Sequence, residues 1–415
     1  MSTFLAAFLA LAGIPLFIVI CALALLGFYQ GGIDLRVVFI EMYRLASTPA
    51  LTAIPLFAFT GFLLAESQAP QRLVRFSQAV LGWLPGGLAI MSLVSCALLT
   101  ALTGASGMTI VALGGLLYPA LRQQRYEERF SLGLLTTCGS LGLLFPPSLP
   151  LIVYGIVSQT PVDQLFCAGL LPGGLLVLVL SVYSFFQGRK HAAPSRPLVW
   201  REIGAACRES ALELLLPIVI FGGIYSGVVA PSEAASLGAF YILVVEVVLY
   251  REIKWCRLPA LIRDTMVLVG GILIVLAAAL AYTNYLVDAE IPTQLLAFIQ
   301  GHIHSRLVFL VLLNIFLLVV GCMLDIFSAL VVVVPLILPI AAAYGVHPVH
   351  LGILFLTNLE IGYSTPPVGL NLFIASLRFD KSLLELARAS LPFVLLLVLC
   401  LLLITYVPYL SLALL

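Results

Sequence analysis

The chain has 415 residues, of which 62% are hydrophobic and only 9% are charged. A soluble domain would carry about 25% charged residues, so this composition excludes a soluble fold and predicts an all-α polytopic protein of the lipid bilayer. The formal net charge of +1 argues against nucleic acid as a partner. The sequence also has no G-x-x-x-x-G-K-[ST] motif, so we expect no ATP hydrolysis by this chain itself.

The first 70 residues lie outside the two repeats described below, and we call this part of the chain, together with residues 211–287, the scaffold. The apolar run at 4–28 is long enough to cross a bilayer and too long for the h-region of a signal peptide, so we expect it to be retained. Residues 30–48 mix charged and apolar side chains, as in a short interfacial helix. A second span follows at 49–65.

Residues 81–121 form a long apolar stretch that the sequence T-G-A-S-G-M-T interrupts at 103–109. Since one crossing needs about 20 apolar residues, the stretch is either two spans joined by a tight turn or a re-entrant hairpin. Basic residues such as Arg72 and Arg122 flank it, which places both ends in the cytoplasm under either alternative. We favour the hairpin, because a similar stretch occurs later in the chain.

The helix expected at 130–158 cannot be continuous. Pro146 and Pro147 remove two backbone donors and push the preceding residue out of α geometry. In hydrocarbon such a break persists only where it faces protein or a wet cavity, so it predicts a binding site. With a further span at 166–186, these elements form a first repeat at 71–190.

A polar segment at 191–210 predicts a cytoplasmic linker helix between the halves. The rest of the scaffold, residues 211–287, contains three spans near 211–228, 234–250 and 265–287. Between the first two of these spans, Glu233 follows a proline and a serine at a helix start, where capping is the expected role.

Residues 288–415 repeat the pattern of the first half and form a second repeat. After an external loop at 288–306, an apolar stretch at 307–343 is interrupted at 321–328. A helix at 351–377 is broken by a second Pro-Pro pair, and a last span covers 391–412.

Five helix-breaking residues recur at a constant offset of 220, which predicts an internal duplication. Pro119, Gly142, Pro146, Pro147 and Pro172 correspond to Pro339, Gly362, Pro366, Pro367 and Pro392. Five crossings lie between the two hairpins, and an odd number inverts the second copy relative to the first. The fold class predicted is therefore an inverted repeat with two re-entrant hairpins and two discontinuous helices, as in secondary transporters.

Asp325 lies at the second hairpin tip inside a long apolar run, where a lone carboxylate suggests a functional site. Its alternative role is pairing with a neighbour or reaching the interface. Sodium prefers carboxylate and carbonyl oxygens, so we expect one sodium site at Asp325 and the second break, and a neutral one at the first tip and break. The predicted sodium ligands are Thr103, Gly104, Ser106, Thr109, Phe145, Pro146, Gly321, Asp325, Gly362, Thr365 and Pro366.

Glu360 lies two residues before Gly362 and is either a proton carrier or second-sphere partner, or a residue that faces the lipid interface. No nucleophile, base and oxyanion hole are arranged in the sequence, so no catalytic residue, organic cofactor or enzymatic activity is expected.

Six ordered motifs make the sequence closely resemble the large membrane subunit of TRAP (tripartite ATP-independent periplasmic) transporters. They are G-A-S-G-M-T-I-V-A-L-G, R-Y-E-E-R-F, L-F-P-P-S-L-P-L-I-V-Y-G, A-P-S-E-A-A, M-L-D-I-F-S-A-L-V-V-V-V-P-L-I-L-P and N-L-E-I-G-Y-S-T-P-P-V-G-L-N-L-F. The family usually has serine at the position of Ala105, so one side-chain ligand is absent from the first tip.

The resemblance implies sodium-driven import of an organic acid anion, such as a C4-dicarboxylate or sialic acid, across the bacterial inner membrane. It also implies a periplasmic substrate-binding protein and a small four-helix membrane subunit. It further implies an elevator-like movement, in which the hairpins and broken helices of 71–190 and 288–415 form a transport domain that moves against the scaffold. We expect the substrate between the hairpin tips, at Ser106, Ser148, Thr365 and Asn371. Two alternatives remain: a stand-alone sodium/anion symporter or exchanger without a binding protein, and an intramembrane enzyme.

Overall fold

The computed structural model describes residues 13–45, 48–190 and 199–415, and every regular element in these ranges is a helix. Six of these helices are long and apolar enough to cross a membrane, or up to seven spans if the bent pair at 128–144 and 149–158 is one of them. The chain is therefore a multi-pass membrane protein, as its composition predicts. Residues 4–12 of the first span and 191–198 of the linker lie outside the described part of the chain.

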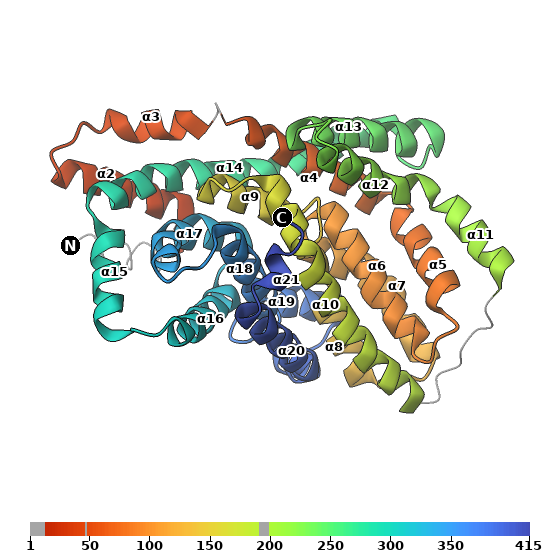
Figure 1. Ribbon diagram of the computed structural model, residues 1–415. Helices are drawn as coiled ribbons and strands as arrows, with labels where there is room; N and C mark the ends of the chain where they lie inside the picture. The colour runs from red at the N-terminus through yellow and green to blue at the C-terminus, as the bar shows by residue number, and fades with distance from the viewer. Residues whose placement is uncertain (1–12, 46–47, 191–198) are drawn as a thin grey trace.

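Helix α14 (Leu258–Asp288) extends along one edge of the molecule and connects its two ends (Figure 1). It packs against α2 (Leu16–Gln30) and α3 (Arg36–Arg44) near the N-terminus, and also against α4 (Ala53–Glu66). The short α3 leaves several apolar side chains exposed, as an interfacial helix would: Phe39, Ile40 and Tyr43.

Helix α13 (Pro231–Leu243) packs against α4 and α12 (Ala211–Tyr225) and continues into the π-helical turn η4 (Val244–Leu249). At its start the backbone N–H of Ala230 donates to Glu233 Oε2 at 2.9 Å, so the predicted capping role of Glu233 is confirmed. The remaining elements in these parts of the chain are η2 (Pro49–Thr52), α11 (Trp200–Glu209) and η5 (Trp255–Arg257).

Helices of the first repeat run from α5 to α10. They are α5 (Ala69–Leu81), α6 (Gly87–Thr103), α7 (Ser106–Gln123), α8 (Glu128–Cys138), η3 (Leu141–Leu144), α9 (Leu149–Ser158) and α10 (Val162–Lys190). The interruption predicted at Pro146 and Pro147 is confirmed, because regular helix stops at Leu144 and resumes at Leu149 with a bend of 47°.

Helices of the second repeat follow the same plan. They are α16 (Arg306–Met323), α17 (Ile326–Ala343), α18 (Pro348–Gly362), α19 (Leu370–Phe379), α20 (Leu383–Tyr406) and the short α21 (Tyr409–Leu412). The break predicted at Pro366 and Pro367 is also confirmed, between Gly362 and Leu370. The connection before this repeat, expected as a loop, contains the helix α15 (Ile291–His302), which starts beside a proline and has no buried residue.

Helix bounds keep the offset that the prolines predicted. Ser106 and Ile326 begin α7 and α17, and the two starts are 220 residues apart, as are the starts of α8 and α18. In each copy only two residues connect the hairpin helices. The opposite membrane orientation of the copies stays a prediction, and so does re-entry, since α16 and α17 are each long enough to cross by length and composition.

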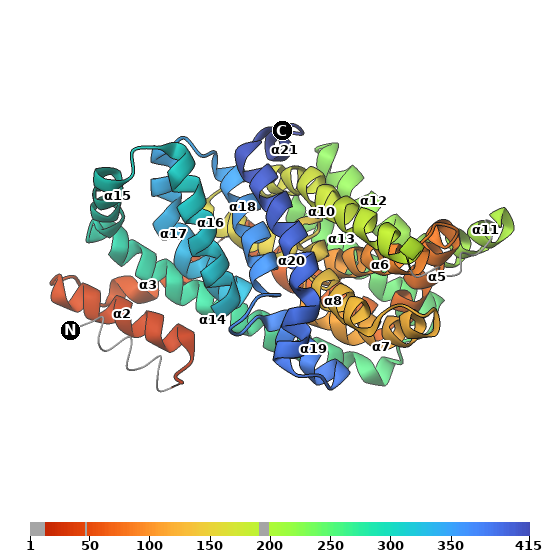
Figure 2. The same cartoon turned by 90° about the horizontal axis from the view of Figure 1, so that it is seen from below.

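The two repeats pack into one body in which α8 lies against α20 and α9 against α17 (Figure 2). At the end of α8 predicted to be cytoplasmic, Lys381 Nζ lies 2.6 Å from Glu128 Oε1. This hydrogen bond is the main cause of a raised pKa for Lys381. Tyr154 of α9 donates to the carbonyl of Pro348 at 2.6 Å, which links the copies a second time.

Arg72 of α5 connects the first repeat to the second scaffold segment. Its guanidinium forms ion pairs with Glu213, Glu246 and Glu252, and its Cζ lies 4.3 Å from the centroid of the Tyr250 ring. The side chains of Glu213 and Glu246 are fully buried, and that of Arg72 is 11% exposed. Burial of Glu213 and Glu246 depends on this one cation, because a buried charge must be paired.

Candidate functional site

The second break lies directly against the second hairpin. Glycines allow the approach: a Cβ added to Gly362 would lie 2.5 Å from the carbonyl carbon of Gly321. On the other side of the break, the backbone N–H of Gly369 donates to the Cys322 carbonyl at 3.0 Å. Gly321 and Gly362, both predicted as sodium ligands, are therefore in contact backbone to backbone.

Asp325 caps the first turn of α17. One carboxylate oxygen accepts the backbone N–H groups of Phe327 and Ser328, both at 3.1 Å, and the other accepts the Ser328 hydroxyl. Asp325 is exposed, and its carboxylate pairs with neighbouring residues, which is one of the alternatives to an ion-site role. A sodium ion at Asp325 would share a carboxylate that already holds the helix end.

Thr365 and Pro366 lie in the same break. The Thr365 hydroxyl donates to the Ile361 carbonyl at 2.8 Å, and Pro366 is exposed. In the same break the Tyr363 hydroxyl accepts the Ile326 backbone N–H, so the break contacts the start of α17 directly after Asp325. Sequence reasoning missed Tyr363, although its place directly after Gly362 marks it as part of the break.

The tip of the first hairpin is buried and polar. Gly104 ends α6 in the left-handed region with φ of 67°, where glycine is favoured. The side chains of the predicted ligands Thr103, Ser106 and Thr109 are at most 5% exposed. A Cβ added to Gly104 would lie 2.8 Å from the Leu149 side chain, so the tip contacts the start of α9 just beyond the first break.

Thr100, which is not among the predicted ligands, connects the helices of this tip. Its hydroxyl lies 2.7 Å from Thr109 Oγ1 and 2.7 Å from the carbonyl oxygen of Gly139, at the end of α8. Three oxygens from three helices therefore converge there. The hydroxyl lies one helical turn before Thr103, which is the spacing that could have identified it.

At the first break itself, Phe145 is half-buried, and Pro146 and Ser148 are buried. The Ser148 hydroxyl has no hydrogen-bond partner among the described residues. Unpaired buried hydroxyls are uncommon in folded proteins, so this group is available to a ligand.

Asn371, a residue of the second repeat, forms a hydrogen bond near the first break. Its Nδ2 donates to Ser140 Oγ at 3.2 Å, between α8 and η3, and its Oδ1 has no partner among the described residues. At the neighbouring tip, a Cβ on Gly107 would lie 2.6 Å from the Ile374 side chain of α19. Of the predicted substrate-binding residues, Asn371 therefore lies close to the first tip and break, whereas Thr365 lies in the second break.

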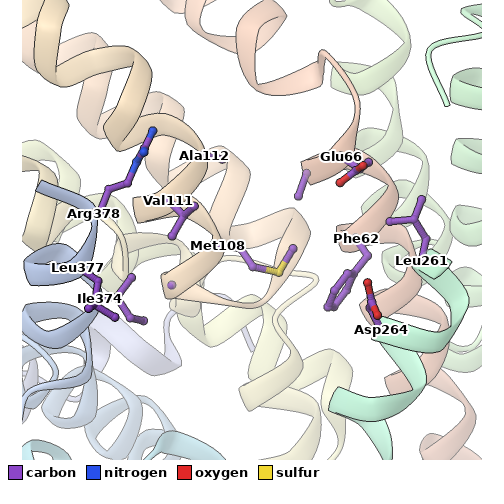
Figure 3. Close-up of a pocket in the computed structure, with 12 residues that line it drawn as sticks. Phe62, Glu66, Met108, Val111, Ala112, Leu261, Asp264, Ile374, Leu377 and Arg378 are labelled. Atoms are coloured by element: carbon purple, nitrogen blue, oxygen red, sulfur yellow. The ribbon is translucent and has the colours of Figure 1, made fainter. Parts of the chain in front are cut away.

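A cavity of about 700 Å³ adjoins this tip (Figure 3). The N-terminal half of α7 forms one wall together with α19, and α4 and α14 form the facing wall. Its lining includes Phe62, Glu66, Gly107, Met108, Val111, Leu261, Asp264, Ile374, Leu377 and Arg378.

Glu360 lies inside the protein rather than at the lipid surface. It is 0% exposed, and neither carboxyl oxygen has a hydrogen-bond partner among the described residues. The lipid-facing interpretation is therefore wrong, because the neighbouring helices α16 and α20 cover α18. The role as a proton carrier stays a prediction.

The sequence matches, over residues 3–410, the model of the DctM component of the tripartite ATP-independent periplasmic transporter. The chain belongs to this family. It is a TRAP transporter large permease, and its relatives are named as transport permeases rather than enzymes, so the resemblance predicted from the six motifs is confirmed.

Two relatives illustrate the range of the family. The chain is 35% identical over 382 residues to the C4-dicarboxylate TRAP transporter large permease DctM of Pseudomonas aeruginosa, covering 92% of this chain and 90% of the relative. It is 31% identical over 398 residues to the ectoine/5-hydroxyectoine permease UehC of Ruegeria pomeroyi, covering 94% and 92%.

The fold also resembles that of the Alcanivorax borkumensis YdaH transporter, whose crystal structure has an unusual topology. The TM-score is 0.67 at 14% sequence identity, and the match covers 94% of this chain and 97% of that one. This likeness extends the shared architecture to a transporter with a very different sequence.

Proposed function

We propose that this permease imports a small carboxylate-bearing solute across the bacterial inner membrane, driven by a sodium gradient. The observation that supports it best is the pairing of each helix break with a hairpin tip, at Gly104 and at Gly321. Broken helices expose carbonyls and amides at membrane depth, which suits sodium and an anion respectively. C4-dicarboxylates and ectoine, named for the two relatives, both carry a carboxylate.

Sodium would occupy two places. The first is the polar tip, where Thr100, Thr109 and the Gly139 carbonyl converge. The second is the open break at Asp325 and Thr365. The solute would lie beside the first place, where the unpaired Ser148 hydroxyl and the Asn371 amide oxygen are available.

The partners follow from the tripartite description of the family. A periplasmic binding protein would deliver the solute, and a small membrane subunit would support the scaffold. The hairpins and broken helices would move as a unit against α14 and its neighbours, in an elevator mechanism. Exposed apolar residues on α2, α12 and α14 supply a surface for lipid and for the small subunit, including Ile18, Ile218 and Val267.

Counter-flow of radiolabelled succinate and of ectoine in proteoliposomes tests the proposal. The permease is reconstituted with its small subunit, with and without sodium and the binding protein encoded beside its gene. We expect uptake only when sodium and the binding protein are both present. Uptake indifferent to sodium would refute the coupling, and full uptake without the soluble protein would favour a stand-alone symporter.

Asp325→Asn should raise the sodium concentration for half-maximal counter-flow at least tenfold. Asparagine is as good a helix cap as aspartate, so the end of α17 stays intact while the ion loses a charged ligand. The matched control is Asp34→Asn, since Asp34 is exposed and accepts the Arg36 backbone N–H at 2.9 Å in a similar turn. Equal sodium dependence in both variants would exclude Asp325 as a ligand.

A further inference from the structure

Three charged side chains line the cavity in Figure 3, and two of them are already paired. Glu66 accepts a hydrogen bond from Arg257 at 3.0 Å, and Asp264 lies 3.2 Å from Arg263. Arg378 has no hydrogen bond or ion pair within the described residues. Its guanidinium is therefore the lining charge that is available to a ligand.

Glycine on α7 makes room for this guanidinium. A Cβ added to Gly115 would lie 1.5 Å from Arg378 Nη2, so the arginine rests directly on the helix backbone. Gly107 at the hairpin tip is eight residues earlier, which is about 12 Å along the helix. The guanidinium of Arg378, from α19, thus contacts α7 farther along that helix than the hairpin tip. Arg378 lines the same cavity as the tip.

The charges divide between the two walls. Arg378 projects from the wall made by α7 and α19, and Glu66 and Asp264 lie on the facing wall made by α4 and α14 (Figure 3). A carboxylate in the cavity would be drawn to the hairpin wall, because Arg378 there is unpaired, whereas the two carboxylates of the facing wall are each paired with an arginine. The basic clusters of the sequence place this end of the cavity in the cytoplasm.

We infer that Arg378 is an anion-binding residue at the cytoplasmic end of the cavity, and that it receives the carboxylate of the solute as the solute leaves the hairpin tip. The planar guanidinium offers several N–H donors in a geometry that matches a carboxylate. The identity of the ligand rests on the proposed function, but the anion-attracting field of Arg378 does not.

Thiol labelling measures that field without transport. Val111 is 50% exposed, lines the cavity and lies one helical turn before Gly115 on the same face of α7. A Val111→Cys variant, with the exposed Cys207 and Cys256 replaced by serine, is labelled in nanodiscs of phosphatidylcholine by anionic and by cationic methanethiosulfonates. Adding Arg378→Gln should lower the anionic-to-cationic rate ratio about threefold or more.

The matched control is Arg208→Gln, because Arg208 is an exposed arginine of α11 that lies outside this cavity. It should leave the ratio unchanged. Succinate should slow the anionic reagent in the parent and not in Arg378→Gln, which separates a soluble carboxylate from a lipid headgroup as the occupant. A ratio unaffected by Arg378→Gln would overturn the inference, whatever transport shows.

Counter-flow then tests the role in release. Arg378→Gln should raise the internal succinate concentration for half-maximal counter-flow about tenfold, while Arg378→Lys restores most of the loss. The external concentration of loaded binding protein for half-maximal uptake should not change. A normal internal value would overturn the role of Arg378, whereas absence of counter-flow in the unmodified protein would contradict the proposed function instead.

Discussion

Replacing Arg72 with methionine should destabilise the folded protein by about 3–5 kcal/mol, because it leaves buried carboxylates without their counter-charge. Methionine fills a similar volume, so the loss is electrostatic rather than a cavity effect. Glu213 and Glu246 are fully buried, and the remaining partner, Glu252, is 16% exposed. Thermal unfolding followed by the loss of monodisperse protein in detergent measures the change.

Arg75→Met supplies the control one helical turn away on α5. Arg75 is 68% exposed and lies 3.5 Å from Glu209, so losing this surface pair should change stability by no more than about 1 kcal/mol. If the two variants unfold at the same temperature, the buried cluster does not hold α5 to the scaffold. Transport need not be active for this comparison.

Adding a methyl group at Gly362 should destabilise the protein by about 1–3 kcal/mol and abolish counter-flow, since the break and the second hairpin touch there. The nearest atoms to the new Cβ are the backbone of Gly321 and Cys322, at 2.5 to 2.9 Å, and backbone cannot rotate away as a side chain can. The corresponding change in the first copy, Gly142→Ala, meets the Ala97 carbonyl oxygen at 2.3 Å and should behave alike.

The control for both is Gly222→Ala in α12, where no heavy atom lies within 4 Å of the added Cβ. Alanine is favoured over glycine in a helix by roughly 0.5–1 kcal/mol, so this variant should be slightly more stable. Normal transport by Gly362→Ala would show that the hairpin and the break are not in close contact in the working protein.

Local chemistry in the sequence was enough to predict the two interruptions, because Pro146–Pro147 and Pro366–Pro367 cannot continue a helix. The constant offset of 220 between such residues reappears in the helix bounds. Glu233 was likewise assigned as a cap from its place after Pro231. These features depend on neighbours in the chain, which a single sequence shows directly.

Contacts between distant residues could not be predicted in the same way. Arg72 lies 141 residues from Glu213, and Asn371 lies 231 residues from Ser140, so nothing in either local pattern indicates its partner. For Glu360 the local pattern left a role as proton carrier or second-sphere partner and a lipid-facing position equally open, and only the packing of α16 and α20 on α18 excluded the second.

Equilibrium binding of radioactive sodium to the purified permease in nanodiscs tests most directly whether the two breaks are ion sites. The comparison needs Asp325→Asn, Thr109→Val and the double variant, all checked for folding by thermal unfolding. We predict that, at the sodium concentration that saturates the unmodified protein, each single variant binds less sodium and the double variant binds none. Saturation equal to that of the unmodified protein in all three would contradict the account.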